Sequence, residues 1–201
     1  VEQHLDAKVT GINNAGAVKG ALMLERLVKE GLMPAGAKYP DMESQFAAGK
    51  TALMINGPWA WDNVKKAKID FAVAPVPAVV PGLPSKPFVG VLGCMITAPS
   101  KLKDIGREFI ENHLLKIDSL KTISADVALG TPANKAYFAE LSSDPNIAAT
   151  MANARAGEPI PNIPEMGRVW PAVDAALEAI TQGRQSPKEA LDGAAARVLT
   201  K

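Results

Sequence analysis

The chain has 201 residues, enough for one large domain or two small ones with hydrophobic cores. Its 22 Lys and Arg residues nearly balance 21 Asp and Glu residues, and the resulting net charge of +1 without any block of like charge argues against nucleic acid or an anionic membrane as the main partner. Hydrophobic residues make up 47% of the chain, too many for disorder, and no apolar run approaches the roughly 18 residues of a membrane-spanning helix.

Cysteine and histidine are scarce, and the many Asp and Glu residues form no distinctive pair. Cys94 is the single cysteine, which excludes an intrachain disulfide and a thiol metal cluster, and its apolar surroundings predict a buried side chain. His4 and His113 lie far apart, and neither stands near a nucleophile motif. We therefore expect a protein that is not an enzyme, with no metal site and no cofactor. No signal peptide precedes Val1, so we expect Val1 to result from processing or to mark a fragment boundary.

The first elements follow from apolar periodicity and capping residues. Residues 15–30 predict an amphipathic helix that ends at Gly31, and Asp41 is expected to cap a second helix that ends at Gly49. The short apolar run 51–55 predicts a strand buried on both faces.

A helix is predicted to begin at Pro58, where a missing N–H costs nothing. At about 100° per residue, Trp61 and Val64 share the apolar face, whereas Trp59 lies on the polar side. In open α/β sheets, ligands bind at such strand-to-helix turns, and a flat aromatic side chain bordered by polar groups suits a sugar ring. Packing of Trp59 under a neighbouring loop is an equally weighted interpretation.

Further strand and helix signals follow. Residues 69–76 predict a strand, a Pro-rich connection follows to Pro87, and the apolar run 88–97 is long enough to pass from one domain into another. Helices are predicted at residues 101–115, 118–123, 132–142, 145–156, 165–182 and 186–200.

The last two predicted helices carry specific signals. Ser186 and Glu189 form a capping box at the start of the final helix, with Pro187 in its first turn. Trp170 lies on a stripe of apolar residues in the helix before it, so its role is divided between core packing and a binding site. The sequence predicts an α/β protein, but its few strands cannot form a sheet large enough for this many helices, so the chain looks like part of something larger.

Several strings resemble the sugar-binding proteins of ABC importers, and in particular the periplasmic maltose/maltodextrin-binding proteins. They are MESQFAAGKTALM at 42–54, INGPWAW at 55–61, PSKPFVGVL at 84–92, IAATM at 147–151, PNIP at 161–164 and GRQ at 183–185. The resemblance implies part of a two-lobed fold that closes on sugar like a flytrap, mostly its carboxy-terminal lobe. By analogy, residues 1–88 and 132–201 belong to that lobe, whereas residues 89–131 cross the hinge into the amino-terminal lobe.

The resemblance also implies binding residues. Trp59 and Trp170 match tryptophans that stack on glucosyl rings, and Ile160 falls where the family has an apolar residue lining the cleft. Pro171 stands where a tyrosine is expected, and it removes a helical N–H and is expected to kink the helix. Asp174 stands where the family places an arginine, so the hydrogen bonds to sugar hydroxyls must differ, which places maltose itself in doubt more than the sugar class.

The function implied is non-catalytic capture of maltose, maltodextrin or a related oligosaccharide. The implied partners are the membrane subunits of an ABC importer and the missing amino-terminal segment, and the implied location is the periplasm or, for a membrane-tethered protein, the cell exterior. Three alternatives stay open. The chain could bind another sugar such as trehalose, a larger glucan or a polyol, could be an enzyme with two carboxylates across a cleft, or could be half of a split protein that is inactive alone.

Overall fold

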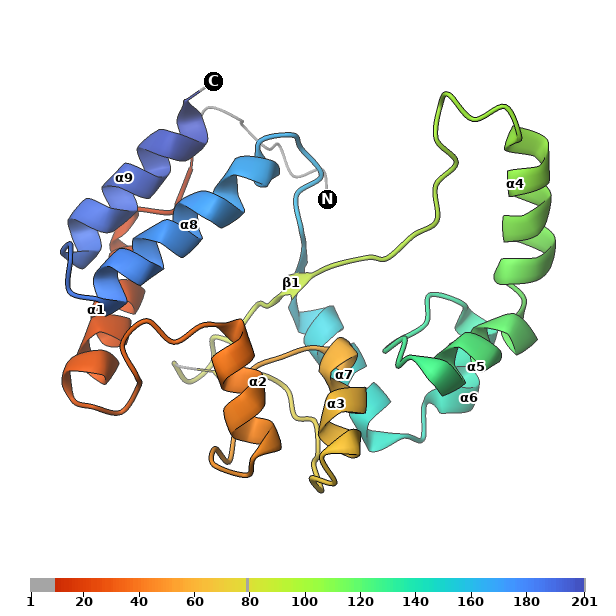
Figure 1. Cartoon of the computed structure of the whole chain (residues 1–201), viewed down its shortest axis with the longest axis horizontal. Helices are drawn as coiled ribbons and strands as arrows, with labels where there is room; N and C mark the ends of the chain where they lie inside the picture. Colours follow the sequence, from red (N-terminus) through yellow and green to blue (C-terminus); the bar gives the residue numbers. More distant parts are fainter. Residues whose placement is uncertain (1–9, 79, 201) are drawn as a thin grey trace. The chain divides into compact units, whose positions relative to one another are not determined.

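The structure is a computed structural model that describes residues 10–78 and 80–200 (Figure 1). These residues form two compact units. The first combines the chain up to Asp41 with the chain from Pro161 onward, and the second is Met42–Ile160. The lobe boundaries expected from the resemblance stay a prediction.

Three helices pack together in the first unit, namely α1 (Ala15–Lys29), α8 (Met166–Thr181) and α9 (Pro187–Leu199), and α8 lies alongside α9 (Figure 1). The predicted helices 15–30, 165–182 and 186–200 are thereby confirmed. Most of the buried residues are small, which lets helix backbones approach closely. The core consists of Ala21, Ala172, Ala176, Ile180, Ala190, Leu191, Ala194 and Val198.

The predicted capping box at the start of α9 is confirmed. The Ser186 hydroxyl donates to Glu189 Oε2 over 2.7 Å, and the Ser186 backbone N–H donates to the same oxygen over 3.1 Å. The backbone N–H of Glu189 in turn donates to Ser186 Oγ over 3.4 Å. These two donors from Ser186, the hydroxyl first, lower the pKa of the Glu189 carboxyl.

Because the capping box lowers the pKa of Glu189, we expect part of the folding stability to depend on pH in the acid range. The stability that ionised Glu189 contributes is fully present above the ordinary glutamate pKa of 4.5. It is lost as the pH falls through the lowered pKa of the folded state. Glu189→Gln is therefore expected to lower the melting temperature near neutral pH and to flatten its decline below that pKa. Thermal unfolding of both proteins across this pH range is the measurement.

Asp192 titrates in the same acid range and is the natural control. Its pKa is also lowered, by the Lys188 ammonium over 2.6 Å and the Asn13 amide over 2.8 Å. Glu189→Gln leaves this contribution in place, so part of the acid dependence must survive in the variant. If the melting temperatures of the parent and Glu189→Gln fell equally steeply with decreasing pH, the prediction would be contradicted.

Short helices joined by extended segments form the second unit. They are η1 (Pro58–Ala60), α3 (Trp61–Lys66), α4 (Lys103–Phe109), the π-helix η2 (Ile110–Leu114), α5 (Ile117–Asp126), α6 (Lys135–Leu141) and α7 (Pro145–Ala156). Helix α2 (Tyr39–Ala47) begins before Asp41, whose carboxylate accepts from the Lys38 backbone N–H over 2.9 Å. Asp41 therefore lies inside the first turn of α2, two residues after the helix begins at Tyr39, and its predicted place as the cap before the helix is wrong.

Both strands predicted before residue 77 are wrong. Residues 51–55 and 69–76 are extended but belong to no strand, and Leu53 is 88% exposed. Within residues 10–78 and 80–200, the only sheet joins β1 (Phe88–Val89) to β2 (Glu158–Pro159) in parallel, two residues each. An apolar run becomes a strand only where neighbouring strands satisfy its N–H and C=O groups.

Two asparagines of α7 partly replace a neighbouring strand for the segment 73–76. Asn146 Oδ1 accepts from the Val73 N–H, and Asn153 Oδ1 accepts from the Val76 N–H, each over 2.9 Å. Asn153 also donates to the Ala74 carbonyl over 3.3 Å. Asparagines seven residues apart lie two turns apart on one helix face, about the distance that three extended residues span.

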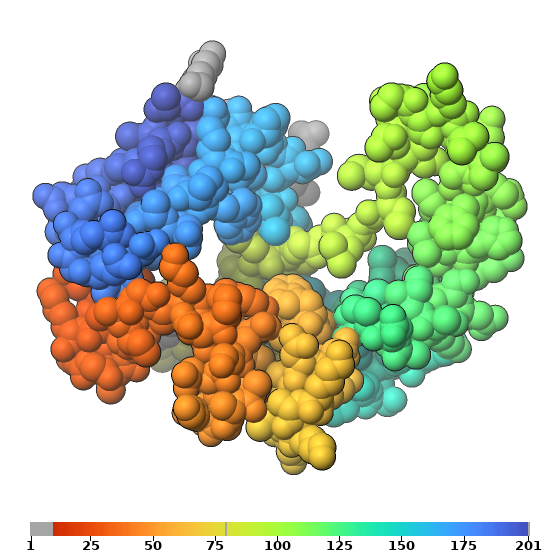
Figure 2. Space-filling model, viewed as in Figure 1, coloured from red at the N-terminus to blue at the C-terminus, as the bar shows by residue number. Residues whose placement is uncertain are grey.

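The apolar run 88–97 pairs only at its start. Beyond β1 the chain is exposed, with Leu92 96% exposed and Val91 and Met95 nearly as much (Figure 2). Cys94 is exposed as well, so its predicted burial is wrong. The run contains the hydrophobic residues of a core strand, but its side chains from Val91 to Met95 stay exposed in the structure.

Candidate functional site

Trp59 sits in the first turn after Pro58, in η1 of the second unit, and its side chain is 66% exposed. Trp61 is half-buried, with its ring centroid 6.5 Å from that of Phe71, and Val64 is buried. The predicted division of this helix into an apolar face and a polar face is therefore confirmed. Trp59 presents much of its indole on the surface of its unit.

Ile160 directly follows β2 in the second unit and is half-buried. Its backbone N–H donates to the Val89 carbonyl over 3.1 Å, which extends the pairing of β1 with β2. Its side chain reaches Gly90, where an added Cβ would lie 3.7 Å from Ile160 Cδ1. The pairing of β1 with β2 therefore positions the backbone of Ile160.

Trp170, Pro171 and Asp174 all lie on α8 in the first unit, and all three are exposed. Trp170 is 49% exposed, and the buried face of α8 instead carries alanines and Ile180. Pro171 stands inside α8, which continues through it, and the Gly167 carbonyl is the group that loses its helical N–H donor. Trp170 and Asp174, four residues apart, occupy neighbouring positions on one side of the helix.

A hollow of about 450 Å³ opens beside Asp174 within the first unit. It lies between α1, the segment 33–40 and α8, and its lining combines apolar and polar side chains. The lining residues are Leu24, Met33, Gly36, Ala37, Lys38, Tyr39, Pro40, Asp174, Leu177, Glu178 and Thr181.

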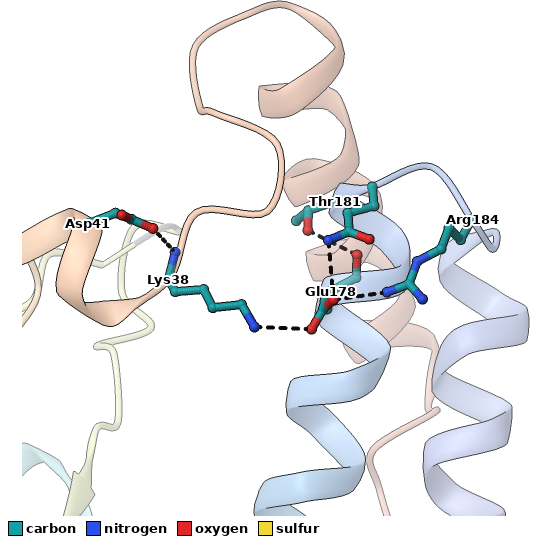
Figure 3. A network of polar contacts seen from close by, with 6 residues as sticks. Lys38, Asp41, Glu178, Thr181 and Arg184 are labelled. Atoms are coloured by element: carbon teal, nitrogen blue, oxygen red, sulfur yellow. Dashed lines mark hydrogen bonds and ion pairs between the residues drawn. The ribbon is translucent and has the colours of Figure 1, made fainter.

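Glu178 is the centre of the polar contacts at this hollow (Figure 3). Its carboxylate accepts from Lys38 Nζ over 3.4 Å, from Arg184 Nη2 over 3.1 Å and from Gln182 Nε2 over 3.2 Å. Sequence reasoning missed Lys38, Tyr39 and Glu178. No spacing signal could have found the Lys38–Glu178 pair, because 140 positions separate the two residues.

The five predicted residues divide between the two units. Trp170, Pro171 and Asp174 come together on α8 of the first unit, and Trp59 and Ile160 belong to the second. In the described part of the chain, no three His, Cys, Asp or Glu residues are grouped so that they could hold a metal ion. His4 lies outside the described residues.

The sequence profile of the bacterial extracellular solute-binding proteins matches residues 2–150. The chain belongs to this family. Solute-binding proteins of the family have a two-lobed fold and are non-catalytic, so the prediction that the chain is not an enzyme is confirmed by membership. No helix among residues 10–78 and 80–200 is long and apolar enough to cross a membrane.

Several relatives in the family are named for oligosaccharides. The galactooligosaccharide-binding protein of Bacillus subtilis is 34% identical over 201 residues, covering 92% of this chain and 45% of the relative. The maltodextrin-binding protein MdxE of the same species is 26% identical, covering 94% and 46%. A maltooligosaccharide ABC transporter solute-binding lipoprotein of Streptococcus pneumoniae is 28% identical, covering 94% and 45%. The chain thus spans slightly less than half the length of these relatives.

Proposed function

We propose that this chain is part of a protein that binds an oligosaccharide without transforming it and delivers it to an ABC importer outside the cytoplasmic membrane. The observation that carries the proposal is the exposure of Trp59 and Trp170 in a chain of the extracellular solute-binding family. The names of the relatives, which include galactooligosaccharides, maltodextrin and maltooligosaccharides, support the sugar class.

The chemistry of both tryptophans suits one face of a sugar ring. An exposed indole offers a rigid apolar plate, and stacking of this kind contributes on the order of 1 kcal/mol per ring beyond area burial. Contacts from both lobes of a two-lobed protein would favour its closed state by hinge bending, and the importer's membrane subunits would then recognise that state.

The polar groups near Trp170 bear on which sugar is bound. An ionised aspartate only accepts hydrogen bonds, whereas the arginine expected at this position only donates them. Asp174 would therefore bind sugar hydroxyls as an acceptor, at the edge of the hollow that Tyr39 and Glu178 also line. Maltose and maltodextrin are one proposed ligand class, and galactooligosaccharides are the second, favoured by the 34% identical relative.

The relatives are about twice as long as this chain, and a corresponding further segment is the proposed partner of the exposed apolar segments. Leu53, Ile55, Val91, Leu92 and Met95 are all more than three-quarters exposed. They lie in extended stretches whose side chains would suit the interior of a larger sheet. We propose that an amino-terminal segment supplies the neighbouring strands, and that this chain alone binds sugar weakly.

Calorimetric titration of the intact protein with maltotriose, galactotriose and trehalose tests the proposal. We expect saturable binding of maltotriose or galactotriose, unchanged sugar after the titration, and much weaker binding by residues 1–201 alone. Adding the amino-terminal segment to residues 1–201 is expected to restore affinity. Absence of binding to every sugar, or release of shorter products, would contradict the proposed function.

A further inference from the structure

We propose that Gly57 is a positioning residue for Trp59, because its lack of a side chain leaves the space that the indole occupies. The inference rests on the proposed function for its effect on sugar affinity, but the geometry on which it depends lies entirely within the second unit.

The indole of Trp59 lies directly against the backbone of Gly57. A Cβ added at Gly57 would lie 2.2 Å from Cζ3, 2.3 Å from Cη2 and 2.7 Å from Cε3 of the ring. All three distances are shorter than the contacts that real Cβ atoms make. Any other residue at position 57 therefore forces the six-membered ring of Trp59 to move.

The backbone conformation does not require glycine here. Gly57 has φ of −119° and ψ of 179°, an extended conformation that every residue adopts. What the structure requires at position 57 is an empty space above Cα. The contact with the Trp59 ring is therefore the physical reason for a glycine between Asn56 and Pro58.

Contacts on two sides hold the backbone on which the ring rests. The Gly57 N–H donates to Asn56 Oδ1 over 2.8 Å, and Asn56 Nδ2 donates to Glu43 Oε1 of α2 over 3.2 Å. On the other side, Pro58 packs against Gly130, where an added Cβ would lie 2.7 Å from Pro58 Cγ and where φ is +71°.

Because these contacts hold the backbone at Gly57, we expect a side chain added there to displace the exposed indole rather than the backbone. Rotation of the ring away from position 57 changes the direction of the flat surface proposed to stack on sugar. Rigid placement of such a surface is what keeps the entropy cost of binding low. Glycine at position 57 thereby acts on affinity through Trp59, without touching the sugar itself.

Gly57→Ala in the intact protein tests the proposal, with Gly20→Ala as the matched control, because an added Cβ at Gly20 meets nothing within 4 Å. The first measurement is the NMR signal of the Trp59 indole N–H without sugar, assigned with Trp59→Phe. We expect Gly57→Ala to shift this signal and Gly20→Ala to leave it unchanged. An unmoved signal overturns the proposal even if no sugar binds, which separates its failure from that of the proposed function.

The second measurement is a double-mutant cycle on affinity for maltotriose and galactotriose. We expect Gly57→Ala to weaken binding by about the factor seen for Trp59→Ala, and to have no further effect in a Trp59→Ala background. An equal loss in both backgrounds would show that Gly57 acts independently of Trp59. If Gly57→Ala alone does not fold, recovery of folding in the Trp59→Ala background supports the proposal, and no recovery overturns it.

Discussion

Trp59→Ala is expected to weaken oligosaccharide binding by the intact protein at least about tenfold, which is about 1.4 kcal/mol. The loss combines the stacking contribution with the apolar area that the indole would bury against a sugar ring. Because the side chain is 66% exposed, its removal is expected to change the melting temperature little. Calorimetric titration with maltotriose and galactotriose, together with thermal unfolding, provides both measurements.

Trp61→Phe serves as the control for this experiment. Trp61 begins α3, directly after η1, and its half-buried ring contacts Phe71, so its replacement is expected to lower stability with little effect on affinity. Unchanged affinity in Trp59→Ala would refute the assignment of Trp59 to the sugar site. An equal affinity loss in Trp61→Phe would indicate that the whole segment, rather than the Trp59 ring, is responsible.

Ile180→Ala is expected to destabilise the unit of α1, α8 and α9 by about 2–5 kcal/mol, the usual cost of removing a buried branched side chain and leaving a cavity. Ile180 is 2% exposed, and the residues around it include several alanines, whose short side chains cannot extend to fill the space. Urea unfolding followed by circular dichroism measures the change in the free energy of unfolding.

Met23→Ala on α1 is the control for Ile180→Ala. Met23 is more than half exposed, so its truncation is expected to change the free energy of unfolding by no more than about 0.5 kcal/mol. If both variants lose the same stability, Ile180 does not occupy the centre of this core.

Signals between residues close in sequence were sufficient to place three of the helices. Apolar periodicity, Gly31 and the capping box at Ser186 placed α1, α8 and α9 within a few residues, because these signals act between residues close in sequence. The same local reasoning separated Trp59 from Trp61, since helical periodicity alone assigns the two side chains to different faces.

The strand predictions failed because a strand is not a local structure. Apolar character in residues 51–55 and 69–76 indicates burial, but pairing depends on other strands, and the described chain supplies only β1 and β2. The exposure of Cys94 has the same origin. Asn146 and Asn153 occupy positions that a strand could have taken, and their spacing shows this only once α7 is seen against residues 73–76.

By itself, the sequence determined the family and helices α1, α8 and α9, and it singled out the two tryptophans of the proposed function as candidates, because each depends on short strings or on helical periodicity. Tertiary structure decided the remainder. It left Trp170 about half exposed, where the sequence had kept both core packing and a binding site open, and it brought Lys38 to Glu178 and the Trp59 indole against Gly57. The physical reason is that these features depend on contacts that form only in the folded chain. Burial, the Lys38–Glu178 ion pair and the packing of a ring on a backbone cannot be read from the spacing of residues along the chain.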